Sequence, residues 1–152
     1  MLKIRRLYSE GSYETPFDKN IDGFEEKWWS QLVFDAMSSR DEFYSFTNEA
    51  EEEVARAWVD WRDYADTYAG INIDHEESYR YLYLFEVRRD CRGRGIGREA
   101  VELLASGFDY LTLLALPEAV GFWEKTSFVH YERIGTQDPR EQQLFVCGHL
   151  PQ

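Results

Sequence analysis

Hydrophobic and polar positions alternate most strictly along residues 79–87. One face of this segment is formed entirely by apolar and aromatic side chains: Tyr79, Tyr81, Tyr83, Phe85 and Val87. The other face carries Arg80, Leu82, Leu84 and Glu86. A period of two residues predicts a β-strand, and two largely apolar faces indicate a central strand covered on each side.

Weaker patterns predict the remaining elements. Apolar residues recur every four positions in residues 24–37 and again from residue 96 to about 108, which predicts two amphipathic helices. Pro117 is suited to the first position of another helix. Short apolar or alternating runs predict strands at residues 2–8, 43–47, 54–61, 110–116, 128–134 and 144–147. Residues 63–78 show no clear period and are expected to form a loop.

This order of elements, β-α-β-β-β-α-β-α-β-β, predicts an α/β layered fold with a mixed sheet. The chain has 152 residues, 43% of them hydrophobic and 16% aromatic, so we expect one packed domain over residues 1–152.

A glycine-rich turn follows the most regular strand and opens the next helix. Its sequence is Arg92-Gly93-Arg94-Gly95-Ile96-Gly97. Glycines allow the backbone to approach a ligand, and successive N–H groups at a helix N-terminus favour negative charge. Arg92, Arg94 and Arg98 would add positive charge, so this turn predicts a pyrophosphate site. The spacing matches neither G-x-G-x-x-G nor G-x-x-x-x-G-K-[ST].

The segment from Val87 to Gly97 resembles the acetyl-CoA-binding motif of the GNAT superfamily of N-acetyltransferases. The motif [QR]-x-x-G-x-[GA] is matched at Arg92, Gly95 and Gly97. Residues 118–128 are similar to the second motif of the family, which usually ends F-Y-E-K-x-G-F. The resemblance covers roughly residues 79–134 well.

The resemblance implies the acyl-CoA N-acyltransferase fold, which is a mixed, mostly antiparallel sheet of six or seven strands with helices on both faces. It also implies that the fourth strand and its neighbour splay apart to admit acetyl-CoA. Val87 would donate its N–H to the thioester oxygen, and the glycine-rich turn would hold the pyrophosphate. The implied cofactor-binding residues are Phe85, Glu86, Val87, Arg92, Gly93, Arg94, Gly95, Ile96, Gly97 and Arg98.

Glu86 is our candidate for the general base, because it is the only acid near the end of this strand. A carboxylate among apolar groups is a stronger base near neutral pH. Glu86 could equally be a solvated strand end or a partner of Arg88 or Arg89. Four residues upstream are further candidates: Asp74, His75, Glu76 and Glu77.

The sequence departs from the family at three positions. Trp123 occupies the place of the tyrosine that usually acts as general acid, and an indole cannot supply a proton at neutral pH. Leu116 falls near a frequent asparagine, and Ser127 replaces a glycine. Tyr131 is our candidate for the replaced acid. Tyr81 and Tyr83 are alternative candidates for the general acid. Trp123 itself could simply pack in the core.

The charge is strongly acidic but unevenly distributed. The net charge is −12. Residues 41–78 contain twelve acids and two bases, a local charge of −10, whereas residues 86–98 contain five arginines and two acids, a local charge of +3. Binding of nucleic acid is therefore disfavoured. An acidic acceptor side would favour a small-molecule amine or a basic peptide, unless the acidity only maintains solubility.

The remaining features exclude several classes of protein. No apolar run reaches membrane-spanning length and no signal peptide is evident, so we expect a cytoplasmic protein with no membrane partner. Cys91 and Cys147 are expected to be free thiols, and no spacing predicts a metal site.

We expect a monomer or a homodimer that transfers acetyl groups from acetyl-CoA to an amine. The alternative is an acyl-CoA-binding module with little or no transferase activity.

Overall fold

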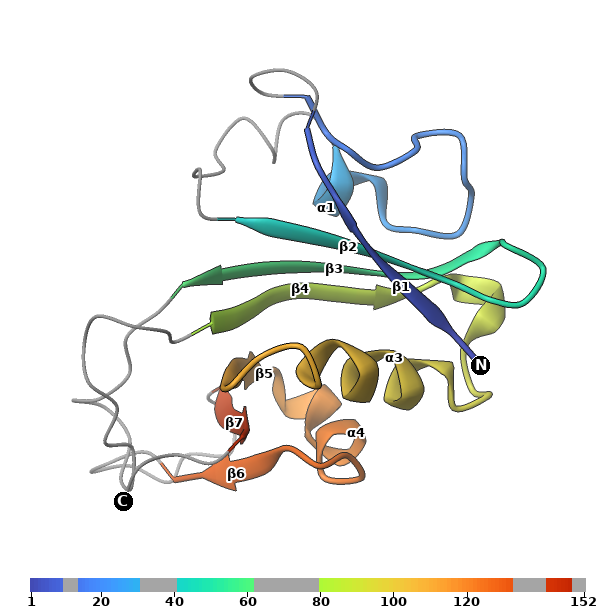
Figure 1. Cartoon of the computed structure of the whole chain (residues 1–152). Helices are drawn as coiled ribbons and strands as arrows, with labels where there is room; N and C mark the ends of the chain where they lie inside the picture. Colours follow the sequence, from blue (N-terminus) through green and yellow to red (C-terminus); the bar gives the residue numbers. More distant parts are fainter. Residues whose placement is uncertain (10–13, 31–40, 62–79, 133–141, 149–152) are drawn as a thin grey trace. The chain divides into compact units, whose positions relative to one another are not determined.

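The computed structural model describes residues 1–9, 14–30, 41–61, 80–132 and 142–148, with only the backbone of Trp61. Its strands are β1 (Lys3–Leu7), β2 (Glu42–Thr47), β3 (Glu53–Trp61), β4 (Arg80–Val87), β5 (Leu111–Ala115), β6 (Val129–Tyr131) and β7 (Gln143–Cys147) (Figure 1). Its helices are α1 (Glu26–Trp29), α3 (Ile96–Ala105) and α4 (Val120–Trp123), with 3₁₀ turns η1 (Arg89–Cys91) and η2 (Pro117–Ala119).

The strands form a seven-stranded sheet in the order β1-β2-β3-β4-β5-β7-β6. The pairs β1–β2, β2–β3, β5–β7 and β6–β7 are antiparallel, and β4–β5 is parallel. The mixed, mostly antiparallel sheet and the order of its elements are therefore confirmed.

Two compact units make up the chain. The first contains Met1–Asp60 and Tyr83–Val101, and the second contains Trp61–Leu82 and Glu102–Gln152. Both β4 and α3 contribute residues to each unit. The single domain over residues 1–152 stays a prediction from the sequence, as does the splaying of β4 from its neighbour.

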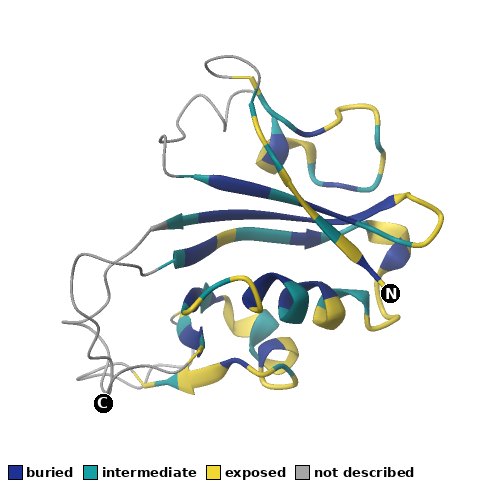
Figure 2. Cartoon of the chain, in the orientation of Figure 1, coloured by how far each residue is buried: buried dark blue, intermediate teal, exposed yellow. Residues whose placement is uncertain are grey.

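Aromatic side chains form the core on one face of the first unit. Phe43 on β2 and Trp58 on β3 are register partners, with ring centroids 5.4 Å apart. Trp29 of α1 and Phe17 pack on this pair to complete the cluster, and their own rings are 4.8 Å apart. Trp29, the one buried residue of the four-residue α1, thus packs against two strands and holds this short helix on the face (Figure 2).

In the second unit, β7 lies between β5 and β6 and supplies much of the core. Leu144, Phe145 and Val146 of β7 are almost fully buried, as is Leu111 of β5. Thr112 is a buried polar residue whose hydroxyl donates to the Arg80 carbonyl at 2.9 Å. Its hydrogen-bonding requirement is therefore met within the sheet.

The expected helix boundaries and faces need corrections. The spacing places both Trp28 and Trp29 on the apolar stripe of the first helix. Trp29 is buried as expected, whereas Trp28 is exposed. The described part of that helix ends at Trp29, and residues 31–40 lie outside the described residues, as do the predicted loops at 63–78 and 135–141. The second helix ends at Ala105 rather than near 108, because Gly107 and Phe108 donate to carbonyls three residues earlier.

None of the described helices is both long enough and apolar enough to cross a bilayer.

Candidate functional site

The glycine-rich turn lies in the first unit, between the end of β4 and the start of α3. Gly93 and Gly95 have positive φ angles of 79° and 81°. No atom lies within 4 Å of a Cβ built on either glycine, so open space faces this backbone. The glycines are therefore required for their backbone conformation, and a ligand has room to approach them.

The N-terminus of α3 supplies donors next to these glycines. The Glu99 N–H donates to the Gly95 carbonyl at 3.1 Å, which is the first helical hydrogen bond. The N–H groups of Ile96, Gly97 and Arg98 precede this bond and have no acceptor within the helix. Three N–H groups at the positive end of a ten-residue helix suit the oxygens of a diphosphate.

Charged side chains around the turn are divided between internal pairs and the surface. The guanidinium of Arg88 donates to Asp90 at 2.6 Å, and this hydrogen bond lowers the pKa of Asp90 and raises that of Arg88. Arg94 and Arg98 are exposed. With both acids of residues 86–98 paired to arginines, the surplus positive charge of this segment remains available to an anionic ligand.

Glu86 is deeply buried, with only 6% of its surface exposed. Its Oε1 accepts from the Glu25 N–H at 2.8 Å and from the Trp29 indole at 2.9 Å. Its Oε2 accepts from the Glu25 N–H at 3.1 Å and from Arg92 at 3.0 Å. The sequence suggested Arg88 or Arg89 as the partner of Glu86. In the structure, Glu86 instead forms an ion pair with Arg92.

Glu86 belongs to the first unit, and the candidate acid Tyr131 belongs to the second. Tyr131 lies on β6 in the second unit, where it pairs with Leu144. Asp74, His75, Glu76 and Glu77 fall outside the described residues. The roles proposed for all of them stay predictions.

Trp123 is a packed core residue of the second unit. It is buried, and its ring lies 4.9 Å from Phe122 and 5.2 Å from Phe128 between centroids. This geometry agrees with plain core packing as the role of Trp123. Leu116, in contrast, is half exposed.

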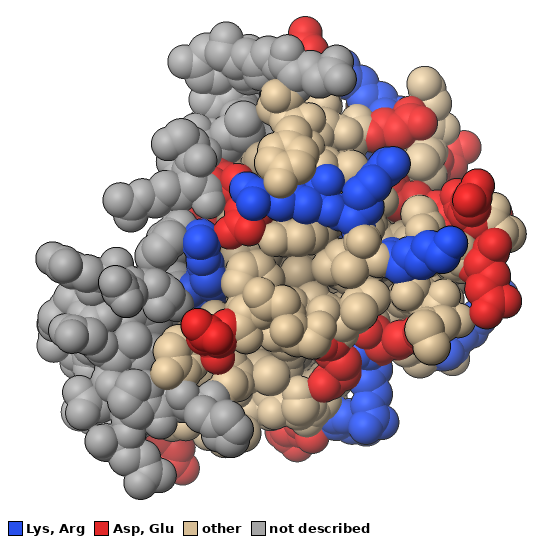
Figure 3. Space-filling view, in the orientation of Figure 1, with Lys and Arg blue, Asp and Glu red and all other residues tan. Residues whose placement is uncertain are grey.

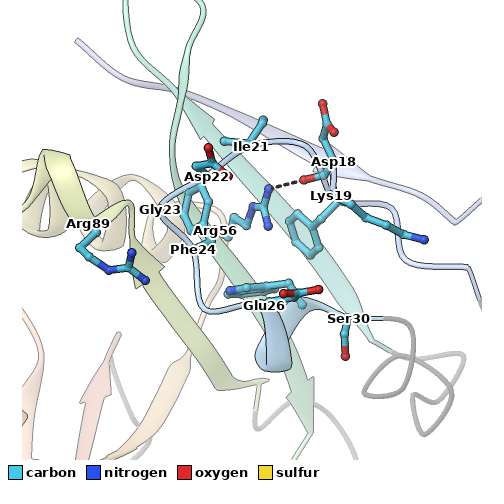
Figure 4. Close-up of a pocket in the computed structure, with 12 residues that line it drawn as sticks. Asp18, Lys19, Ile21, Asp22, Gly23, Phe24, Glu26, Ser30, Arg56 and Arg89 are labelled. Carbon is cyan, nitrogen blue, oxygen red and sulfur yellow. Dashed lines mark hydrogen bonds between the residues drawn. The ribbon is translucent and has the colours of Figure 1, made fainter.

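A pocket of about 480 Å³ lies in the first unit, and it was not predicted from the sequence. Arg56 lines it together with Phe17, Phe24, Trp29 and Arg89 (Figure 4). The guanidinium of Arg56 is buried over the Phe24 ring at 4.1 Å. It is paired with Glu53 at 2.7 Å and donates to the Asp18 carbonyl at 2.9 Å.

One signal in the sequence could have indicated this pair. Arg56 interrupts an apolar strand, and Glu53 precedes it by three residues. A charge inside a buried strand requires a partner of opposite sign. The same pair shows that part of the acidic segment 41–78 is neutralised internally. Glu42, which lies 3.4 Å from Arg6, is neutralised in the same way.

The turn is also not the only basic surface of the described residues. Lys3, Arg5 and Arg6 of β1 are exposed, and Figure 3 shows basic side chains along this strand. Because β1 is an edge strand, these charges hinder pairing with another chain. They therefore have a structural explanation that is independent of the turn.

The model of the acetyltransferase (GNAT) family matches residues 21–128. This chain belongs to that family. The match includes β4, the glycine-rich turn and α3, so the GNAT resemblance inferred from the two motifs is confirmed, and with it the acetyltransferase class of enzyme.

Solved structures of GNAT proteins share the fold over nearly the whole chain. The Bacillus subtilis N-acetyltransferase YlbP, in complex with coenzyme A, has a TM-score of 0.58 at 20% identity, covering 98% of this chain and 97% of that chain. Arabidopsis thaliana NAA60, in complex with acetyl-CoA, has a TM-score of 0.58 at 13% identity, covering 97% and 98%. A GNAT acetyltransferase from Elizabethkingia anophelis with acetyl-CoA bound has a TM-score of 0.60 at 13% identity, again covering 97% and 98%.

No curated protein sequence matches this GNAT chain significantly. At these identities, the similar structures establish the fold and leave the acceptor open.

Metal-ligating side chains are not clustered in the part of the chain that the structure describes: no three of His, Cys, Asp and Glu there could hold an ion. Cys91 and Cys147 are both free thiols, and Cys91 is buried.

Proposed function

We propose that this GNAT chain transfers the acetyl group of acetyl-CoA to a primary amine by direct attack. The observation that carries the proposal is the turn with two positive-φ glycines, which faces open space at the N-terminus of α3. Arg92, Arg94 and Arg98 surround it with positive charge. The turn fits a diphosphate because it combines space, N–H donors and cations.

The residues of this chain would hold the cofactor in two places. Residues 92–98 would bind its diphosphate, and the backbone of residues 85–87 would bind its pantetheine arm as an added strand. Bound acetyl-CoA supplies a thioester carbonyl. The N–H of Val87 would donate to that carbonyl oxygen and stabilise negative charge that develops on it.

The amine must also lose a proton, and the leaving sulfur must be tolerated. The sequence offers Glu86, Asp74, His75, Glu76 and Glu77 as candidate bases, and Tyr131 as the candidate acid. Glu86 already accepts from Glu25, Trp29 and Arg92, so its use as a base requires that one of these donors be displaced. A thiol with a pKa of about 8.5 can leave as a thiolate, so the reaction does not require a strong acid at the position of Trp123.

Calorimetry with coenzyme A tests the cofactor site. We expect a dissociation constant in the micromolar range or below for the unmodified chain. Gly95→Ala should weaken binding, because the added Cβ disfavours the required φ and enters the open space. Gly121→Ala is the matched control, since its Cβ also meets no atom within 4 Å but the position lies in α4. Absence of coenzyme A binding by the unmodified chain would overturn the proposal.

From the acidic balance of the whole chain, we further propose that the acceptor is cationic, either a small amine or a basic peptide. Thiol release from acetyl-CoA across a panel of amines and peptides would identify it. The KM of a cationic acceptor should rise with ionic strength as its attraction is screened. An anionic acceptor with a KM insensitive to salt would contradict this part of the proposal.

The second candidate is an acyl-CoA-binding module, and the burial of Trp123 motivates it. If this module reading is correct, the chain binds acetyl-CoA but transfers to no amine of the panel until Trp123→Tyr restores activity. A working transferase should show activity without that substitution. A cytoplasmic location and a monomeric or homodimeric state remain predictions from the sequence.

A further inference from the structure

We infer that Glu86 is a positioning residue that holds Arg92 in place for the diphosphate of the cofactor. The inference rests on the proposed function for its ligand. It differs from that proposal in giving Glu86 a role through Arg92 rather than in proton transfer.

Because Glu86 is buried, the stability of its carboxylate depends on its hydrogen-bonding and ionic partners. Its side chain is 5% exposed, and a buried carboxylate is stable only when it is hydrogen-bonded and its charge is compensated. Glu25 and Trp29 supply neutral N–H donors. Arg92 alone among these partners supplies positive charge, at 3.0 Å. The buried carboxylate of Glu86 therefore requires its pair with Arg92.

Two anchors fix the guanidinium of Arg92. Its Nε donates to the Val87 carbonyl at 2.9 Å, and its Nη2 donates to Glu86. An arginine has five N–H donors, so three remain for another acceptor. The side chain of Arg92 is 51% exposed, which leaves it accessible to a ligand. Arg92 directly precedes Gly93, so this fixed charge stands at the start of the turn.

The same geometry argues against a free base. A carboxylate has about four lone-pair directions, and those of Glu86 are taken by four contacts from three donors, because the Glu25 N–H is shared between both oxygens. A proton from an amine would have to displace one of these donors. Holding Arg92 requires no such displacement.

Removal of the Glu86 charge should change the affinity for coenzyme A in opposite directions for a positioning role and for a simple charge effect. Removing a negative charge near a diphosphate site should strengthen binding if only Coulomb attraction matters. Loss of the carboxylate that fixes Arg92 should weaken binding, because the guanidinium then has to be ordered by the ligand.

The test is calorimetry with coenzyme A on Glu86→Gln and on Glu99→Gln. Both variants lose one negative charge in the first unit, but Glu99 bonds the Leu2 N–H and makes no hydrogen bond to Arg92. We expect the dissociation constant to rise about tenfold for Glu86→Gln, the effect of one lost charge-assisted contact, and to stay within about twofold or fall for Glu99→Gln. At saturating acetyl-CoA, the pH profile of kcat should keep its shape in Glu86→Gln.

Unchanged or tighter binding by Glu86→Gln would overturn the inference. So would a fall in kcat of about 10²-fold or more with loss of the basic limb of the pH profile, which would identify Glu86 as the base. If Glu86→Gln fails to fold, Arg92→Lys is the second variant. A lysine keeps the positive charge but cannot make both hydrogen bonds to Val87 and Glu86, so coenzyme A binding should weaken by a similar factor.

A readout without cofactor separates this inference from the proposed function. In an NMR spectrum of the unliganded chain, the Arg92 Nε–H should be protected from exchange, and Glu86→Gln should reduce that protection. If the unmodified chain bound no coenzyme A, the proposed function would fail. The exchange measurement would still show whether Glu86 holds Arg92 in place. An unprotected Nε–H in the unmodified chain would contradict the inference directly.

Discussion

At the scale of single residues, backbone conformation explains the glycines of the turn better than close packing does. A Cβ at Gly95 would meet no neighbour, yet its φ of 81° is unfavourable for any residue with a side chain. Gly148 also has a positive φ, of 119°, and in addition its Cβ would lie 2.1 Å from the Asp109 carbonyl oxygen. Backbone conformation therefore explains both glycines, and close packing is a further reason at Gly148.

Gly95→Ala should lower the free energy of unfolding by roughly 1–2 kcal/mol, the cost of a left-handed conformation for a residue with a Cβ. Gly121→Ala should instead raise it by roughly 0.5–1 kcal/mol, as expected for alanine in a helix. Urea denaturation of both variants measures the difference. Equal effects would show that the backbone at Gly95 relaxes without strain.

At the scale of elements, Ser127 connects the turn after α4 to the second half of α3. Its N–H and hydroxyl donate to the two oxygens of Glu102 at 2.7 and 2.6 Å. Both residues belong to the second unit. The serine that departs from the family glycine therefore adds a contact between two elements.

Ser127→Ala should destabilise the chain by about 1 kcal/mol, because it removes one hydrogen bond to a carboxylate at an exposed position. The N–H bond to Glu102 remains in this variant. Glu102→Gln is the matched test, since it retains the acceptor geometry of one oxygen and loses the charge. Thermal unfolding that left Ser127→Ala unchanged would show that water replaces the hydroxyl without cost.

At the scale of the whole molecule, the net charge of −12 opposes compaction by self-repulsion. Raising the ionic strength from about 0.01 to 0.1 M shortens the screening length from about 30 to 10 Å. Added salt should weaken long-range repulsion more than it weakens buried ion pairs such as Arg56–Glu53, whose side chains are only 4% and 8% exposed.

We therefore expect the unfolding temperature to rise with salt over this range. A gain of about 1 kcal/mol corresponds to about 2–4 °C for a chain of this size. The same ionic strength set with a second monovalent salt controls for binding of a specific ion. A temperature that falls with salt would indicate that exposed ion pairs outweigh the net repulsion.

The sequence by itself determined the order of the elements, the central strand and the glycine-rich turn. These follow from short-range patterns: a period of two in β4, a four-residue spacing in α3 and glycines that precede a helix. The two motifs were sufficient for the family, because they combine residue types with a fixed separation along the chain.

Only the tertiary structure decided which groups meet. The contact between Glu86 and Trp29 and the pocket of Arg56 depend on how segments distant in sequence pack together. The pair Glu86–Arg92 spans six residues, and it depends on how the turn folds back onto the end of β4. Periodicity assigns a side chain to a face but does not name its partner on another element. The sequence therefore shows Glu86 as an acid at the end of a central strand, whereas its three hydrogen-bond donors are seen only in the fold.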